Sequence, residues 1–294
     1  MFRRALWLMA ALPMALAAQD TTTAKASLLA ADRAAGTSAT ALARALAPDA
    51  SLLLPGLDVM RGRAAWTSHL PALATASGGR HAWSPLHAVV SRDGTLGCTT
   101  GVLHLVAADT TQPGTGRYAA CWKRERVGAW RMMALARAHA PPRALSLPDS
   151  LPGAPGSTGT VAPKGVDAAR EMTEADRAFA TFSADSGDPG GAFARWIAAD
   201  GMMLGARAVP ARGPDEARAA FPPPPYNGRF TWRPIDALTT ASRDGSLGFT
   251  IGEARIAASD ADVSYSKYLT LWRREGDGAY RFIFDLGSNR PAPR

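Results

Sequence analysis

The stretch SRDGTLGCTTG at residues 91–101 returns as SRDGSLGFTIG at residues 242–252, and this pair of segments decides the fold. A second pair keeps nearly the same spacing, because Tyr118–Glu125 resembles Tyr268–Glu275. A period of about 150 residues is the length of a whole domain, whereas solenoid repeats run to about 20–50 residues. The sequence therefore predicts two tandem copies of one domain.

The N-terminus has the pattern of a secretory signal. Arg3 and Arg4 precede an apolar run that ends in a small-x-small cleavage pattern at residues 15–17, so residues 1–18 are predicted to be a signal peptide. The run is shorter than the ~20 residues that a membrane-spanning helix needs. We expect a periplasmic or secreted protein that has no membrane span once the signal is removed.

Composition separates the two copies. The predicted domains are residues 22–142 and 166–292, and the Pro- and Gly-rich residues 143–165 between them are predicted to be a linker. The net charge of +8 comes almost wholly from scattered arginines, and there is no basic run with interleaved aromatic residues. Composition and export therefore both argue against a nucleic-acid partner.

Each copy has the same predicted order of elements, with helices first and antiparallel strands after them. Such a chain is typical of an α+β fold whose helices pack on one face of a sheet. The expected helices are residues 24–35, 39–46 and 62–70 in the first copy and 171–184, 191–198 and 213–221 in the second. The main expected strands follow, beginning at residues 51, 81 and 130 in the first copy and 202, 230 and 280 in the second.

The long hairpin of the second copy shows clear alternation. Leu247, Phe249, Ile251, Glu253 and Arg255 share one face, which is apolar at one end and charged at the other. If the hairpin is symmetric about its loop, the partners on this face are Leu271, Leu269 and Lys267, the last of them opposite Arg255. This face is predicted to line a cavity with an apolar floor and a polar mouth.

Several motifs resemble the nuclear transport factor 2-like superfamily, and its SnoaL-like branch most closely. They are residues 175–179, Arg212-Gly213, the turn and strand at 244–248, the strand at 267–274 and the C-terminal segment at 284–289. The superfamily includes ketosteroid isomerase, scytalone dehydratase, polyketide cyclases and many non-enzymatic binding modules. The resemblance implies two cone-shaped α+β domains, which in this superfamily commonly pair through their sheets. An intramolecular pseudo-dimer is therefore expected.

Differences between the copies indicate candidate site residues, because features kept in both more often serve the fold. Asp285 corresponds to Leu135, and Glu253, Arg255 and Lys267 correspond to Val102, His104 and Arg117. Asp176 and Asp285 are candidate proton acceptors. Glu253, Arg255 and Lys267 are candidate ligand-binding residues for an anionic or hydroxylated molecule. A buried, paired Asp176 and a solvated salt-bridge cluster are the structural alternatives.

Trp232, Trp83 and His104 complete the candidate ligand-binding set. The tryptophans match across the copies and are expected to line the cones, or to be core aromatics. His104 is placed opposite Arg117 in the assumed register. No histidine pair has metal spacing, and neither a phosphate loop nor a nucleophile elbow is present, so we expect no metal and no cofactor.

Cys98 and Cys121 are the two cysteines of the chain. The assumed register makes them diagonal neighbours about 7–8 Å apart, slightly beyond disulfide reach. Their counterparts are Phe249 and Leu271, which favours two buried thiols, although an oxidising compartment leaves a disulfide open.

Three functions remain open at this point. The leading prediction is an exported protein that binds a small, partly apolar molecule in the second cone. The alternatives are a cofactor-free isomerase, dehydratase or cyclase with Asp176 or Asp285 as base, and a protein-interaction scaffold with filled cones.

Overall fold

A computed structural model describes residues 11–70, 80–106, 114–126, 128–139, 159–205, 209–223, 228–259 and 261–293. Side chains are described in the same ranges except at 11–20, 80–82, 104–106, 114–115 and 139. Most of the predicted signal peptide and of the linker, and the side chain of His104, lie outside the described residues. Within the described part of the chain, no helix is long and apolar enough to cross a membrane.

The first repeat places its helices before its long strands. The helices are α1 (Ala11–Ala35), α2 (Ala39–Ala45) and α3 (Arg63–Trp66), and a 3-10 turn follows at Thr67–His69. The strands are β1 (Leu46–Leu53), β2 (Met60–Arg61), β3 (Arg80–Val90), β4 (Leu96–Val106), β5 (Gly114–Arg124) and β6 (Trp130–His139). They pair in the order β2-β1-β6-β5-β4-β3, and only the β1–β6 pairing is parallel.

The second repeat has the same plan. Its helices are α5 (Ala168–Ser186), α6 (Pro189–Trp196) and α7 (Gly213–Ala219), with a 3-10 turn at Asp236–Leu238. Its strands are β7 (Ile197–Met203), β8 (Ala211–Arg212), β9 (Arg229–Pro234), β10 (Thr240–Ala241), β11 (Leu247–Ala257), β12 (Val263–Arg274) and β13 (Tyr280–Arg290). They pair in the order β10-β11-β12-β13-β7-β8, and β9 also pairs with β11. The predicted α+β class with two tandem helix-and-sheet units is confirmed.

Helix α5 begins earlier than the sequence suggested. Asp167 caps it by accepting a hydrogen bond from the backbone N–H of Arg170, so the helix begins before the expected residue 171. Gly187 ends the helix in the left-handed conformation, at φ 61°. The added turn contributes Ala168 to the apolar cluster between the helices and the second sheet.

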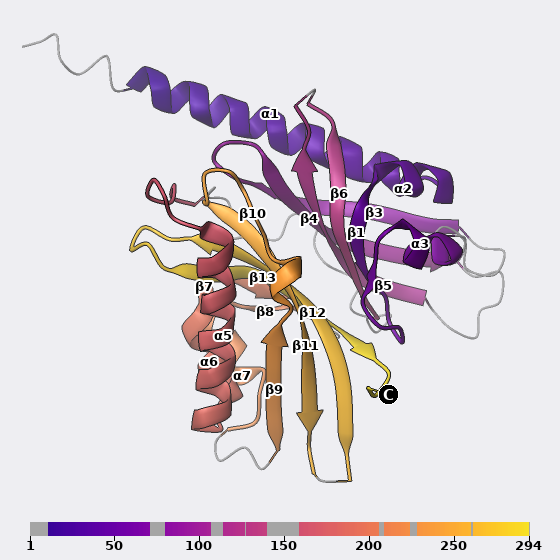
Figure 1. Cartoon of the computed structure of the whole chain (residues 1–294), viewed down its shortest axis with the longest axis vertical. Coiled ribbons are helices and arrows are strands. Elements are labelled where there is room, and N and C mark those ends of the chain that lie inside the picture. The colour runs from indigo at the N-terminus through magenta and orange to yellow at the C-terminus, as the bar shows by residue number, and fades with distance from the viewer. Residues whose placement is uncertain are drawn as a thin grey trace, which may run out of the picture.

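The two sheets pack against each other, with helices on their outer faces (Figure 1). One apolar cluster fills the space between the sheets and includes Cys98, Ala134, Phe249, Leu271 and Ile283. Two further clusters lie between each sheet and its own helices. The molecule therefore has four layers in the order helices, sheet, sheet, helices.

This packing corrects the predicted position of the cavity. The apolar face with Leu247, Phe249 and Ile251 contacts the other repeat, and does not line the cone. The cone is lined by the opposite face of the same strands. Alternation shows which residues share a face, but both faces of this sheet are covered, so hydrophobicity alone did not identify the one that meets the helices.

The register of the hairpins is also corrected. Glu253 pairs with Lys267 and Ile251 with Leu269, a shift of two residues from the prediction, because the loop is centred one residue earlier. In the first repeat the same shift places Arg117 opposite Val102, so His104 is not its partner. A two-residue shift preserves which residues share a face.

The corrected register places Cys98 directly opposite Cys121, with a Cα–Cα distance of 4.1 Å, and the two form a disulfide. The expectation of two free thiols was therefore wrong.

The two repeated Asp-Gly turns bind each other. The backbone N–H of Asp93 donates to Asp244 Oδ2 at 2.9 Å, and the backbone N–H of Asp244 donates to Asp93 Oδ2 at 3.1 Å. The backbone N–H groups of Arg92 and Arg243 similarly donate to Ser246 Oγ and Thr95 Oγ1. The most strongly repeated segment of the sequence therefore joins the two repeats.

Two buried cations make a second reciprocal contact. Lys267 Nζ donates to the backbone oxygens of Leu54 and Asn289, both at 2.6 Å, and the residue is fully buried. Arg117, its counterpart, donates from Nη1 to the backbone oxygens of Leu204 and Gly205, at 3.5 and 2.8 Å. Leu54 and Gly205 occupy equivalent positions, because Ser51 pairs with Arg61 as Met202 pairs with Arg212. Each repeat therefore supplies a cation to the other.

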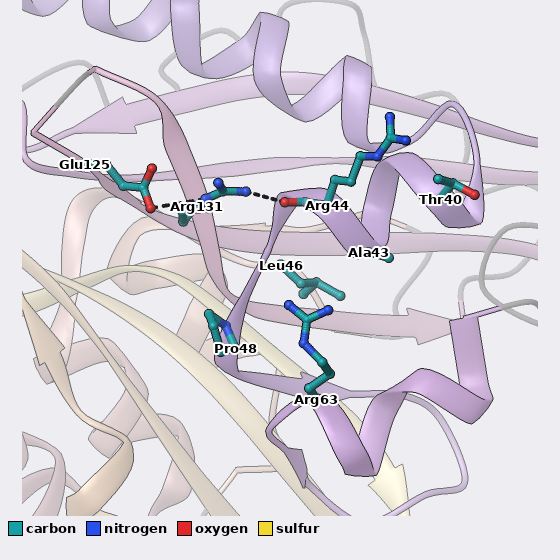
Figure 2. A pocket seen from close by; sticks show the side chains of 8 residues that line it. All are labelled: Thr40, Ala43, Arg44, Leu46, Pro48, Arg63, Glu125 and Arg131. Carbon is teal, nitrogen blue, oxygen red and sulfur yellow. Dashed lines mark hydrogen bonds and ion pairs between the residues drawn. The ribbon is translucent and has the colours of Figure 1, made fainter.

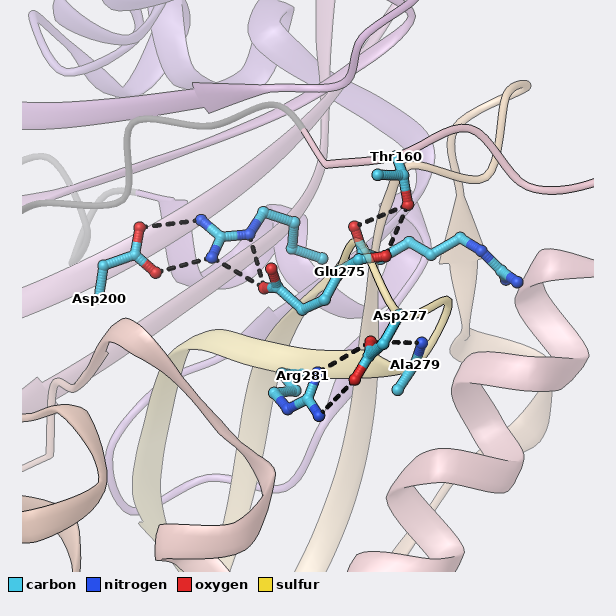
Figure 3. A network of polar contacts seen from close by, with 8 residues as sticks. Thr160, Asp200, Glu275, Asp277, Ala279 and Arg281 are labelled. Carbon is cyan, nitrogen blue, oxygen red and sulfur yellow. Dashed lines mark hydrogen bonds and ion pairs between the residues drawn. The ribbon is translucent and has the colours of Figure 1, made fainter.

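The segment before α5 is fixed to the second sheet near a buried arginine (Figure 3). Thr160 Oγ1 donates to the backbone oxygen of Glu275 at 2.7 Å. Arg273, with a side chain only 5% exposed, binds both carboxylate oxygens of Asp200 at 2.7 and 3.0 Å and also binds Glu275 at 2.8 Å. A bidentate pair of this kind gives a charged group a defined geometry.

Candidate functional site

The second cone encloses a cavity of about 50 Å³ between α5, α6 and the sheet. Four aromatic side chains line it, those of Phe179, Phe193, Phe230 and Trp232. Their ring centroids lie 4.5–6.1 Å apart, so the rings pack on one another and fill most of the cone. The remaining space is about that of one or two water molecules.

Two carboxyl groups reach this cavity. Asp176 comes from the buried face of α5, and Asp285 comes from β13 at the position paired with Thr270 on β12. Tyr268 donates its hydroxyl to both oxygens of Asp176 at 3.1 Å, and Thr270 donates to Asp285 Oδ1 at 2.7 Å. No lysine, arginine or histidine lines the cavity in the part of the chain that is described.

Burial sets the electrostatics of the pair. It raises the pKa of Asp176 to about 7, against hydrogen bonds from Thr250, Tyr268 and Trp232, and the nearby Asp285 adds to the rise. Burial also raises the pKa of Asp285 to about 6, although the hydrogen bond from Thr270 opposes it. Near neutral pH both groups can therefore exchange protons, which suits them to hydrogen bonding or to proton transfer.

The first cone repeats only half of this arrangement. Asp32 is fully buried and accepts hydrogen bonds from Trp83 Nε1 at 2.7 Å and from Tyr118 at 2.9 Å. Burial raises its pKa to about 6. Leu135 stands where the second cone has Asp285, so the aspartate–tyrosine–tryptophan group is common to both cones and the second acid is not.

The predicted site residues therefore fall into separate places. Asp176, Asp285 and Trp232 lie around one cavity, and Trp83 holds the matching position in the first cone. Lys267 is buried between the repeats. Glu253 and Arg255 lie on the other face of the sheet, so their predicted place at the mouth of the cone is wrong.

Glu253 and Arg255 instead line a groove of about 300 Å³ formed by β9, β11, β12 and the end of β13. Glu253 forms ion pairs there with Arg233 at 3.6 Å and with Arg290, which also binds Asp58 at 2.8 Å. These contacts satisfy the charge of Glu253 within the protein. Glu253 therefore belongs to a salt-bridge cluster at the ends of strands, which was the structural alternative to a binding role.

A larger groove, of about 380 Å³, lies on the first repeat between α2, α3 and β6 (Figure 2). Arg131 spans it by binding Glu125 at 3.1 Å and the backbone oxygen of Arg44. Arg131 and Glu125 are about 40% exposed, so the ion pair is in contact with water. Neither groove brings together buried polar groups as the cone does.

Sequence reasoning missed Tyr268 and Thr270, which were not among the candidate site residues. A signal for Tyr268 was present in the glycine opposite it on the neighbouring strand. A Cβ atom on Gly252 would meet the Tyr268 hydroxyl, and one on Gly101 would meet the ring of Tyr118. The repeated glycine–tyrosine pair therefore indicates a tyrosine lying flat across the sheet, with its hydroxyl near the helix that carries the aspartate.

The raised pKa of Asp285 predicts that the effect of Asp285→Asn on stability depends on pH. A raised folded-state pKa means that the folded protein gains stability from the bound proton at low pH and loses it as the pH rises through about 6. Asp285→Asn cannot ionise, and its amide oxygen still accepts from Thr270. We expect it to be about 2 kcal/mol more stable than the native protein at pH 8 and equal to it at pH 4, by urea denaturation.

Asp262→Asn is the matched control for this measurement, since Asp262 is exposed in the loop after β11. It should leave the free energy of unfolding unchanged at both pH values. A gain from Asp285→Asn that is the same at pH 4 and pH 8 would contradict the assigned cause.

Comparison with known proteins finds similarity in solved structures, while no family model and no curated protein matches the chain. A ketosteroid isomerase-like protein from Erwinia carotovora atroseptica is 15% identical, with a TM-score of 0.34, over 43% of this chain and 98% of its own. A nuclear transport factor 2-like protein with a cystatin-like fold, from Novosphingobium aromaticivorans, is 16% identical, with a TM-score of 0.33, over 41% and 80%.

A third similar structure, from Catenulispora acidiphila, is in complex with S-DNPA. It is 10% identical, with a TM-score of 0.33, over 41% of this chain and 91% of its own. Each match thus spans about the length of one repeat. The expected resemblance to nuclear transport factor 2-like and ketosteroid isomerase-like proteins is confirmed at the level of the fold.

Proposed function

We propose that this protein binds a small, partly apolar molecule in the cone of its second repeat. One observation carries the proposal: the cavity combines aromatic walls with two carboxyl groups, one of which the first repeat lacks. Binding sites for small molecules are typically apolar pockets with a few placed polar groups. The small volume limits the part of the ligand that enters to a few non-hydrogen atoms.

The two repeats act in this proposal as an intramolecular pseudo-dimer, with the first repeat as a structural partner. The reciprocal turn contacts and the reciprocal buried cations support it. In the same arrangement the apolar faces of the two sheets cover each other. They are then not available to bind another protein, which argues against the scaffold alternative.

Export to the periplasm or to the medium belongs to the same proposal. Its support is the charged start and apolar run at the N-terminus, together with the Cys98–Cys121 disulfide, which is typical of an oxidising compartment. The mass of the protein recovered from the export compartment of its own host tests it. We expect a mass that lacks about the first 18 residues and two further hydrogen atoms, which are lost when the disulfide forms.

Ligand binding is tested by titrating the purified protein with 3-methylbutan-1-ol, a neutral probe with a small apolar group and one hydroxyl. Two-dimensional NMR should show saturable shifts at the Trp232 indole N–H and at the Gly287 amide, both beside the cavity. Phe179→Trp, which fills the cavity, should abolish them. Absence of saturable shifts in the folded native protein, both with this alcohol and with its ammonium and carboxylate analogues, would refute binding in this cone.

A second candidate function is cofactor-free proton transfer, of the isomerase, dehydratase or cyclase kind. The observation that favours it is the pair of carboxyls that line one cavity with pKa values of about 7 and about 6, so that one can take a proton while the other holds one. Native mass spectrometry of the exported protein would identify a retained molecule for assay. If the Asp285→Asn variant binds and turns over that molecule as the native protein does, Asp285 has no role in either function.

A further inference from the structure

The cavity in the second cone has an excess of acid, and this sets the charge of its ligand. This inference rests on the proposed binding function and names the chemical class. Asp176 and Asp285 both line the cavity, and the described residues around it include no basic side chain. A buried pair of acids is costly to ionise unless a cation compensates it. The described residues that form the walls of the cavity do not supply that cation.

The hydrogen-bonding groups in the cavity can receive a donor. Asp285 accepts one hydrogen bond, from Thr270, and a carboxylate has about four lone-pair positions. Asp285 also keeps partial exposure, as do Phe230, Trp232, Ser266 and Gly287, and these residues form the rim. A donor that enters past the rim can therefore reach a carboxyl with spare acceptor capacity.

The aromatic walls favour the same charge. Phe179, Phe193 and Trp232 line the same cavity as the two carboxyls, and a cation near the face of such a ring is attracted by its quadrupole. The same walls provide apolar surface for a short hydrocarbon chain. An ammonium group on a small alkyl chain satisfies the carboxyls and the rings together, and an anionic group satisfies neither.

The first cone shows the arrangement without this excess. Asp32 receives hydrogen bonds from Trp83 and Tyr118, and Leu135 replaces the second acid. One buried carboxyl with neutral donors is a common structural group. The additional carboxyl, on the strand that lines the opposite wall, is what distinguishes the second cone.

We infer that the second cone binds the ammonium group of a small, partly apolar amine, held between Asp176 and Asp285, with its first alkyl carbons against the aromatic walls and the rest of the alkyl part at the rim. Asp285 is the residue that selects the amine over a neutral molecule of the same shape.

The experiment compares three probes of nearly equal shape and different charge: 3-methylbutylammonium, 3-methylbutan-1-ol and 3-methylbutanoate. Affinities are measured by NMR titration of the full mature chain at pH 7.5. We expect the ammonium to bind at least about tenfold more tightly than the alcohol, as charged hydrogen bonds in a buried site require, and the carboxylate not to bind.

Asp285→Asn should lower the affinity for the ammonium by about tenfold or more and change that for the alcohol by less than about threefold. Asp262→Asn makes the same chemical change on an exposed loop and should alter neither. If Asp285→Asn alters the fold, Asp285→Glu, which keeps the charge on a longer chain, should retain the preference for the ammonium over the alcohol.

Equal or tighter binding of the alcohol would overturn the inference while leaving small-molecule binding in the cone intact. Ammonium binding that survives Asp285→Asn unchanged would also overturn it, because Asp285 would not be the selecting group. Failure of all three probes to bind would overturn the inference and the proposed function together.

Discussion

Lys267→Met is expected to destabilise the protein by about 3 kcal/mol. Lys267 Nζ binds the backbone oxygens of Leu54 and Asn289 in a fully buried position, and methionine removes the donor while keeping most of the side-chain volume. The two carbonyl groups would then be buried with one hydrogen bond fewer each, at about 1–3 kcal/mol for each group. Urea denaturation followed by circular dichroism at pH 7 measures the change.

Two further variants make this result specific. Lys164→Met changes an exposed lysine and should alter the free energy of unfolding by less than about 0.5 kcal/mol. Arg117→Met removes the reciprocal contact to Leu204 and Gly205, and a loss similar to that of Lys267→Met is expected. A Lys267→Met protein as stable as the native one would show that these contacts do not hold the repeats together.

Loss of the Cys98–Cys121 disulfide is expected to cost about 3 kcal/mol, through the greater freedom of the unfolded chain when a 23-residue separation is no longer closed. The variant Cys98→Ala with Cys121→Val suits the test, since both positions are buried between the sheets. Denaturation with and without dithiothreitol gives an independent measurement on the native chain.

Reduction with dithiothreitol opens the disulfide without replacing the cysteines, so it measures the effect of the lost cross-link apart from the effect of changed packing. It should destabilise the native protein by nearly the same amount as the double substitution and leave the double variant unaffected. A native protein with the same midpoint of unfolding with and without dithiothreitol, once its thiols are shown to be reduced, would contradict the expected contribution.

The arrangement of elements could be read from the sequence because the chain presents it twice. Each doubtful segment in one repeat had a counterpart, so the turn at Asp244 and the strand after it supported the same assignment at Asp93. The alternation of β11 and β12 correctly grouped Phe249, Ile251 and Leu271 on one face.

The sequence did not predict which part of the molecule each sheet face contacts. Phe249 and Ile251 are apolar because they contact the other repeat, and no property of the strand itself separates that contact from a contact with helices. The predicted register of the hairpins was wrong for a related reason. Moving the centre of the loop by one residue keeps the alternation of faces but shifts the partner of each strand residue by two positions. That small error is what separated Cys98 from Cys121 in the predicted sheet.

The site was predicted in part for the same reason. Asp176, Asp285 and Trp232 were found because they could be compared with Asp32, Leu135 and Trp83. Tyr268 was missed because the tyrosine is present in both repeats and the comparison gives repeated residues to the fold. Its hydroxyl bond to Asp176 depends on the distance between a strand and a helix, which sequence spacing does not encode.

The exchange of hydrogen bonds between Asp93 and Asp244 has a consequence for how this chain could diverge. A contact in which each side supplies the same groups works equally well between two identical molecules, where any substitution necessarily occurs on both sides. Joining the copies in one polypeptide keeps them at a high effective concentration and removes that obligation. One half can then acquire an acid such as Asp285 while the other keeps leucine, so duplication permits an asymmetric protein on a symmetric frame.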